Sequence, residues 1–190
     1  PPVDNPSLDI GCYAMNVIFV LDESGSIGGN ANDVEAGVLA FLNALNGQDA
    51  QVALIEFSYT GALVNNYTLV NQSYIDAIQA YFDCTSGGTG CYEPNGGTNW
   101  HDAMLEVDNL TSADLVLFFT DGEPTGWDIG GNQCSTWNTT ETPEIVNPVK
   151  LSNKIKNEGT HMFMLGVGMG VDQQNLQRMS GLEVYVQGTN

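Results

Sequence analysis

The chain has 190 residues, of which 42% are hydrophobic, so it has the length of one domain and can form a full core. It carries 23 acidic residues against four Lys and Arg, a formal net charge of −19, and all four cations lie after position 149. Because phosphate binding requires clustered cations, this composition argues against nucleic acid and anionic membrane surfaces as partners. The longest apolar runs have the length of strands, so direct membrane insertion is not expected either.

Strand and helix patterns alternate along the chain, which is typical of a mostly parallel sheet with helices on both faces. In chain order, we predict strand 15–21, helix 32–46, strands 51–57 and 62–70, helix 73–82, helix 100–110, strand 113–120, a loop over 121–141, a long helix, strand 160–167, helix 172–179 and strand 183–186. The short connection after residue 57 allows a hairpin, which makes one strand antiparallel. Ser73 and Asp76 indicate a capping box, and either Pro143 or Pro148 suits the start of the long helix.

The cysteines contain no C-x-x-C pair, so the spacing of a zinc ribbon or a thioredoxin site is absent. Cys84 and Cys91 enclose a flexible Gly-rich run, which predicts a disulfide between them. Cys12 and Cys134 then either pair with each other or stay free. Oxidised cysteines predict an exported protein. Since the chain opens with Pro1 rather than Met, we expect it to be part of a longer protein.

Three short clusters of hydroxyl and carboxylate residues lie at the ends of predicted elements. Asp-Glu-Ser-Gly-Ser (22–26) and Thr-Asp-Gly (120–122) each follow a buried strand, and Gly-Gly-Thr-Asn (96–99) precedes a helix. In an open α/β sheet, ligands bind in the crevice at the carboxyl ends of the strands. The three loops are therefore expected to converge on one site.

The donor atoms of these clusters indicate the ligand. Asp22 and Asp121 offer carboxylates, while Ser24, Ser26 and Thr98 offer hydroxyls, and the set contains no imidazole or thiolate. An all-oxygen set suits a hard cation such as Mg²⁺, Mn²⁺ or Ca²⁺ and is a poor site for zinc or copper. The simpler interpretation, in which the serines and Asp121 only cap turns, does not account for Thr98.

In their order and separation, the three clusters resemble the metal-ion-dependent adhesion site of von Willebrand factor type A domains, over about residues 13–187. The resemblance implies an α/β fold: a Rossmann-like, doubly wound, mostly parallel sheet of six strands, one of them antiparallel, with one divalent cation at its top. It also implies that Asp22, Ser24, Ser26, Thr98 and Asp121 hold this cation directly or through water.

The same resemblance divides the chain into an N-terminal extension, residues 1–12, and a type A domain, residues 13–190. The chain ends soon after its last strand, where the family continues into a C-terminal helix, so that helix is expected to be missing.

Aromatic residues accompany the predicted site. Tyr92, Trp100, Trp127 and Trp137 are assigned to loops at the same end of the sheet. They either form an exposed ligand rim that stacks on a sugar or anchors a partner, or pack the long loops onto the domain.

The leading hypothesis is a non-enzymatic, extracellular or cell-surface adhesion module that binds a protein or glycan ligand through the cation. Its acidic, Lys-poor composition is similar to that of large secreted bacterial adhesins of the RTX type used in biofilm attachment. The alternative is a structural or matrix-assembly domain in which the cation only stabilises the fold. A hydrolase with His101 as base is a third hypothesis, although the serines lack a G-x-S-x-G elbow.

Overall fold

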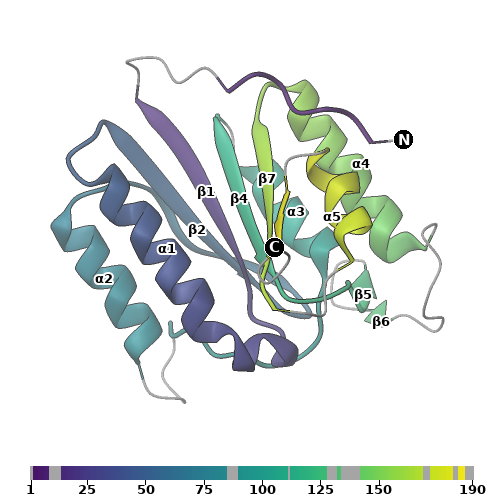
Figure 1. Cartoon of the computed structure of the whole chain (residues 1–190), viewed down its shortest axis with the longest axis horizontal. Helices are drawn as coiled ribbons and strands as arrows, with labels where there is room; N and C mark the ends of the chain where they lie inside the picture. Colours follow the sequence, from purple (N-terminus) through teal and green to yellow (C-terminus); the bar gives the residue numbers. More distant parts are fainter. Residues whose placement is uncertain are drawn as a thin grey trace.

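Figure 1 shows the computed structural model, which describes residues 2–8, 14–84, 90–110, 112–127, 132–133, 142–168, 172–181 and 184–186. One sheet has the strand order β3-β2-β1-β4-β7-β8. Its strands are β1 (Met15–Asp22), β2 (Ala50–Phe57), β3 (Gly61–Leu69), β4 (Leu115–Thr120), β7 (His161–Gly166) and β8 (Val184–Val186). The helices are the 3-10 turn η1 (Gly25–Gly29), α1 (Ala31–Leu45), α2 (Gln72–Asp83), α3 (Trp100–Asn109), α4 (Pro143–Asn157) and α5 (Gln173–Ser180).

The pairing of the strands confirms the predicted fold class. β1 pairs in parallel with β2 and β4, β7 pairs in parallel with β4 and β8, and β3 is antiparallel to β2. The chain winds outward in both directions from β1 and β4, so the point where the strand order reverses lies between these two strands. In such a sheet, this is the place where a ligand crevice opens.

Two hydrophobic layers enclose the sheet, with α1 and α2 on one face and α3, α4 and α5 on the other (Figure 1). In β1, Val17, Phe19 and Leu21 face the first layer, while Ile18 and Val20 face the second. All five side chains are fully buried, which explains why this strand is a continuous apolar run rather than an alternating one.

Two predicted helix starts are resolved by the structure. The capping box at Ser73 is wrong: α2 begins at Gln72, and the N-cap is Asn71, whose side chain accepts a hydrogen bond from the Tyr74 amide at 3.0 Å. Asparagine caps at least as well as serine, and Asn71 already has extended backbone angles. Pro143, not Pro148, is the first residue of α4. There a proline forfeits no helical hydrogen bond.

The long loop after Asp121 contains a small antiparallel pair, β5 (Gly126–Trp127) and β6 (Asn132–Gln133). The predicted disulfide is present between Cys84 and Cys91, whose Cα atoms are 5.7 Å apart. The predictions for Cys12, Cys134 and Trp137 lie outside the described residues.

None of the helices in the described ranges has the length and apolar character needed to cross a membrane.

The segment assigned to an N-terminal extension is hydrogen-bonded to the domain. The Asn5 side chain donates to the carbonyls of Met162 and Ser180 at 2.7 and 2.8 Å and accepts from the Met162 amide at 2.9 Å. Lys156, which is 3% exposed, donates to the carbonyl of Val3 at 2.6 Å. Burial lowers the pKa of this amine to about 8. Residues 3–5 therefore complete the packing around β7, α4 and α5.

Candidate metal centre

The first and third sequence clusters meet because β1 and β4 are neighbours. Their register places Leu21 opposite Phe119, so the next residues of both strands emerge side by side. The Thr120 hydroxyl donates to Asp22 Oδ2 at 2.6 Å, and the Ser26 hydroxyl donates to Asp121 Oδ1 at 2.9 Å. Residues almost a hundred positions apart in the chain are thus joined by direct hydrogen bonds.

The second cluster lies against the first through backbone contacts. The Gly25 amide donates to the Gly96 carbonyl at 3.0 Å. Thr98, which is 3% exposed, is held by Thr125: the Thr98 amide donates to Thr125 Oγ1 at 2.9 Å, and the Thr125 amide donates back to the Thr98 carbonyl at 2.7 Å. All three predicted clusters therefore lie together at the carboxyl end of the sheet.

The side-chain oxygens form a connected chain across this end. The Ser24 amide donates to Asp22 Oδ1 at 2.8 Å, and the hydroxyls of Ser24 and Ser26 are 3.1 Å apart. Ser24 has extended backbone angles, which places its side chain on the same side as that of Asp22, while Ser26 lies in the 3-10 turn η1. The hydrogen bonds link Asp22, Ser24, Ser26 and Asp121 in sequence.

The surroundings of Asp22 and Asp121 disfavour the ionised form of both carboxyl groups. Asp22 is fully buried, and loss of water raises its pKa to about 6, although hydrogen bonds from Ser24 and Thr120 act in the opposite direction. The charge that acts on Asp22 is another carboxylate, Asp121, which raises the pKa further. Burial also raises the pKa of Asp121. Two ionised carboxylates without a neutralising charge destabilise each other here.

The donor set fits a hard divalent cation. Two carboxylates and nearby hydroxyl oxygens are ligands that Mg²⁺, Mn²⁺ and Ca²⁺ accept, and a +2 charge would offset the repulsion between Asp22 and Asp121. No group of three or more His, Cys, Asp or Glu positioned to hold a metal occurs in the described part of the chain. A cation at this end of the sheet would therefore depend on the serine and threonine hydroxyls as well as on the two aspartates.

The predicted exposed rim is wrong for two of its aromatic residues. Trp100 is 0% exposed, and its indole N–H donates to Thr120 Oγ1 at 3.3 Å. Tyr92 is 7% exposed, and its hydroxyl donates to the backbone carbonyl of Asp22. Both rings lie in the core and support the site through the groups that surround Asp22. Trp127 lies in β5, and its side chain is outside the described part of the structure.

Two residues of the site were missed in the sequence. Thr120 belongs to the third cluster, but the sequence analysis assigned it no role. Because it ends a buried strand directly before Asp121, its hydroxyl could have been expected to bond a polar side chain at the end of the neighbouring strand. Tyr59, at the tip of the β2–β3 hairpin, is 40% exposed and packs against Gly96 and Gly97, directly before Thr98. No local pattern marks this contact, because it depends on how the hairpin meets the loop before α3.

The hydrogen bonds of the two serine hydroxyls run to each other and to Asp121. His101 lies in the first turn of α3 and is partly exposed. Both hydroxyls are thus engaged with neighbouring oxygen atoms, an arrangement that suits the holding of a hard cation.

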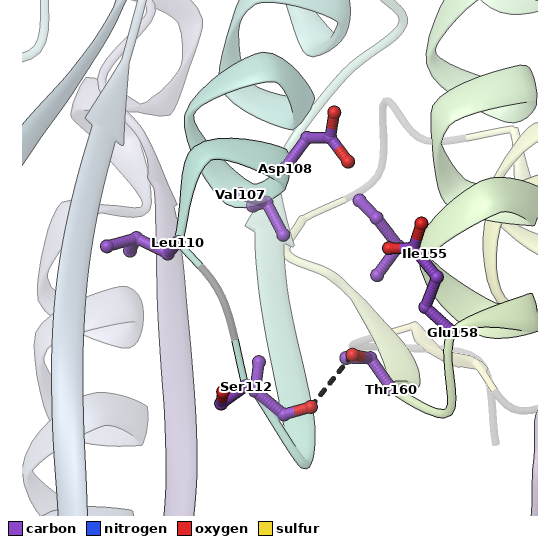
Figure 2. Close-up of a pocket in the computed structure, with 8 residues that line it drawn as sticks. Val107, Asp108, Leu110, Ser112, Ile155, Glu158 and Thr160 are labelled. Atoms are coloured by element: carbon purple, nitrogen blue, oxygen red, sulfur yellow. Dashed lines mark hydrogen bonds between the residues drawn. The ribbon is translucent and has the colours of Figure 1, made fainter.

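A cavity of about 150 Å³ lies at the other end of the sheet (Figure 2). It is lined by the last turns of α3 and α4 and by residues just before β4 and β7, and the Thr160 hydroxyl donates to the Ala113 carbonyl at 2.8 Å beside it. Lys154 bridges Asp108 and Glu158 at its edge. Because the cavity is at the amino ends of the strands, it does not belong to the candidate metal centre.

The fold is a doubly wound α/β domain with an oxygen-rich cluster at its topological switch point. The chain belongs to the von Willebrand factor type A domain family, whose model matches residues 16–186.

Among curated proteins, the inter-alpha-trypsin inhibitor heavy chain H2 of Sus scrofa is 27% identical over an alignment 183 residues long, and the match covers 87% of this chain and 17% of that protein. The chain thus spans about a sixth of that relative's length. Among solved structures, a pilus adhesin of Lactobacillus rhamnosus GG matches with a TM-score of 0.67 and 19% identity, covering 97% of this chain and 29% of that one. The manganese-loaded TRAP protein of Plasmodium vivax matches with a TM-score of 0.63 and 17% identity, covering 90% of this chain and 64% of that one.

Proposed function

We propose that this chain is an extracellular adhesion domain that binds a protein or glycan ligand through one divalent cation held by Asp22, Ser24, Ser26, Thr98 and Asp121. One observation supports the proposal most directly. The Thr120–Asp22 and Ser26–Asp121 hydrogen bonds join the loops after β1 and β4, and the loop that holds Thr98 lies against them.

The cation would supply an electrophilic centre that accepts an oxygen of the ligand. The chain's own residues set the geometry. The Ser24 amide and the Thr120 hydroxyl each bind one oxygen of Asp22 and so fix the plane of its carboxylate. Ser26 fixes Asp121 in the same way. Because three of the five proposed ligands are neutral hydroxyls, two carboxylates alone balance the charge of the ion.

Three further observations support this function. The chain is similar to proteins that include a pilus adhesin and a manganese-loaded protein. The Cys84–Cys91 disulfide suits an oxidising, extracellular location. The compact, hydroxyl-rich set favours Mg²⁺ or Mn²⁺, whereas Ca²⁺ is favoured by its abundance outside cells. An origin in a large bacterial adhesin of the RTX type stays a prediction.

A structural or matrix-assembly role is the second candidate, and the burial of the site favours it. Asp22, Ser24 and Thr98 are 0%, 1% and 3% exposed. A cation bound among such deeply buried groups would stabilise the fold through its linkage to the native state, whether or not a ligand reaches it.

The first experiment separates cation binding from simple salt effects. EDTA-stripped protein is titrated with Mg²⁺, Mn²⁺ and Ca²⁺ while its melting temperature is followed. We expect a saturable rise for the wild type that is lost in Ser26→Ala, because this change removes the hydroxyl that fixes Asp121. Ser73→Ala, in the exposed first turn of α2, should behave like the wild type. An equal response of both variants would contradict the assigned site.

The second experiment tests adhesion. Arrays of matrix proteins and glycans are probed with the intact domain in the preferred cation and in EDTA. Adhesion requires capture that depends on the cation and is lost in folded Asp121→Ala. If the cation raises the melting temperature but the domain captures nothing on the arrays, the proposed adhesion function is wrong and the structural role is retained.

A further inference from the structure

Exposed large hydrophobic side chains are concentrated in one segment. Among the described residues, Tyr59, Leu63 and Leu69 are the large hydrophobic residues that are clearly exposed, at 40%, 41% and 49%. All three lie in the β2–β3 hairpin and the edge strand β3. The same segment lies in the longest charge-free run of the chain, from Phe57 to Ile75, in a protein of net charge −19. Apolar and uncharged surface is therefore gathered along one edge of the sheet.

Tyr59 brings one end of this edge to the candidate metal centre. A Cβ atom added to Gly97 would lie 2.5 Å from Tyr59 Cε1, and one added to Gly96 would lie 2.9 Å from Tyr59 Cδ2. The ring thus packs directly on the two glycines that precede Thr98. Asn99 secures this arrangement, because its amide and its side chain donate to the carbonyls of Ser58 and Tyr59, both at 2.9 Å.

Leu63 continues the surface on the same side of the sheet. It is opposite Ile55 in the antiparallel register, and residues in direct opposition have side chains on the same face. Ile55 belongs to the core layer that includes α3. The hairpin is also tied to α3 by the hydrogen bond from the Gly61 amide to Asp102 Oδ2 at 2.7 Å. Tyr59 therefore borders the loop that holds Thr98, and Leu63 lies two residues beyond the Gly61 contact with α3, on the α3 face of the sheet. These two residues are here called the hairpin surface.

We propose that the hairpin surface binds apolar side chains of a protein ligand, next to the acidic residue whose carboxylate reaches the metal centre. This inference rests on the proposed function and identifies the ligand class. An acidic ligand approaching this domain is repelled by fixed negative charge over about a Debye length, ~8 Å at physiological salt. The hairpin adds no charge of its own to this field, and the Asp102 carboxylate that lies against Gly61 belongs to a residue that is only 9% exposed. The Tyr59 ring suits either a sugar or an apolar side chain, but an exposed leucine provides neither hydrogen bonds nor a flat ring for a sugar. It matches the apolar side chain of a protein.

An array of synthetic pentapeptides with a central Asp tests the proposal. The flanking residues are Leu and Phe in one set, Gly and Ser in a second and Lys in a third, and glucuronate-containing oligosaccharides are spotted beside them. The probe is the full chain in Mg²⁺ and in EDTA. Wild type should bind the Leu/Phe set about tenfold more tightly than the Gly/Ser set in Mg²⁺, the value expected for covering roughly half of a leucine side chain.

The variants are Tyr59→Ser and Leu63→Gln, with Leu69→Gln as the matched control at the far end of β3. Both hairpin variants should lose the preference for apolar neighbours, and Leu69→Gln should keep it. Because Tyr59 packs on Gly96 and Gly97, Tyr59→Ser can also disturb the metal centre. If this variant loses the Mg²⁺-induced rise in melting temperature, the result of Leu63→Gln alone decides the test.

The outcomes distinguish the two proposals. Mg²⁺-dependent binding of every Asp peptide regardless of its neighbours, or an equal effect of Leu69→Gln, would overturn the hairpin surface and leave the metal-dependent function intact. Stronger capture of the oligosaccharides than of any peptide would overturn the protein ligand. No Mg²⁺-dependent binding of any probe, together with no effect of Mg²⁺ on the melting temperature, would overturn the proposed function and this inference with it.

Discussion

Replacing Asp22 with Asn should stabilise the cation-free protein. The native pKa of this carboxyl is raised from 3.8 to about 6, mainly by burial. Each pKa unit corresponds to 1.36 kcal/mol, so the ionised carboxylate costs about 3 kcal/mol of folding free energy above pH 6. Asn has nearly the same shape and no charge, so Asp22→Asn removes this cost.

The surroundings of Asp22 can accept an amide. The amide oxygen can replace Oδ1 as acceptor for the Ser24 N–H, which is now 2.8 Å away. The amide nitrogen can donate to Thr120 Oγ1, whose own hydrogen can then turn to the Gly122 carbonyl at 3.2 Å. No buried donor is left without an acceptor by the exchange, so the electrostatic effect should dominate.

The sign of the effect depends on pH. Since the native pKa lies above the unfolded value, the native state binds more protons between about pH 4 and 6, and its stability falls as the pH rises through this window. The advantage of Asp22→Asn over wild type should therefore be below about 1 kcal/mol at pH 4 and grow to about 3 kcal/mol at pH 7.5.

Urea unfolding in EDTA at several pH values measures this difference. Asp76→Asn, at an exposed position of α2, is the control and should change stability by less than about 0.5 kcal/mol at all pH values. In Mg²⁺ the order should reverse, because a neutral amide at position 22 cannot balance the charge of the ion. The reasoning would be refuted if Asp22→Asn were less stable than wild type in EDTA at pH 7.5, or if the difference did not depend on pH.

Two further predictions concern local geometry. Asn71→Ala should cost about 1 kcal/mol by removing the cap of α2, while Ser73→Ala should leave chemical unfolding almost unchanged; the reverse order would restore Ser73 as the cap. Gly97→Ala places a methyl group 2.5 Å from Tyr59 Cε1 and 3.0 Å from Thr125 Oγ1, so it should cost about 1–3 kcal/mol and diminish the cation-induced rise in melting temperature by shifting Thr98. Gly29→Ala, with no atom within 4 Å of the added carbon, should change neither quantity, and a full cation response in Gly97→Ala would show that the glycine pair does not position Thr98.

The strands of the sheet could be predicted because a strand that is buried on both faces is apolar at successive positions, and such a run is visible in the sequence. β1 is covered on both faces, so its residues from Val17 to Leu21 are all apolar. The metal-centre residues could be proposed for a related reason: strands that are parallel end at the same edge of a sheet, so polar residues just beyond β1 and β4 had to lie close together.

The tertiary structure alone decided which loop aromatic residues face the solvent. Trp100 and Tyr92 follow or lie within polar loops, yet they are buried, whereas Tyr59 in a three-residue turn is exposed. The orientation of each ring depends on contacts with distant segments: Thr120 for Trp100, Asp22 for Tyr92 and Gly96–Gly97 for Tyr59. Composition and periodicity predict the type of helix or strand in which a residue lies. They do not predict which distant segment its side chain contacts.

The sequence by itself therefore determined the doubly wound sheet and the oxygen donors at its carboxyl end. Only the packed structure placed Thr120 on Asp22, buried Tyr92 and Trp100 of the expected rim and put an uncharged, partly apolar hairpin beside Thr98. The physical reason is that alternation and apolar runs follow from burial within one element, while the surface around a site is made where loops from several elements meet.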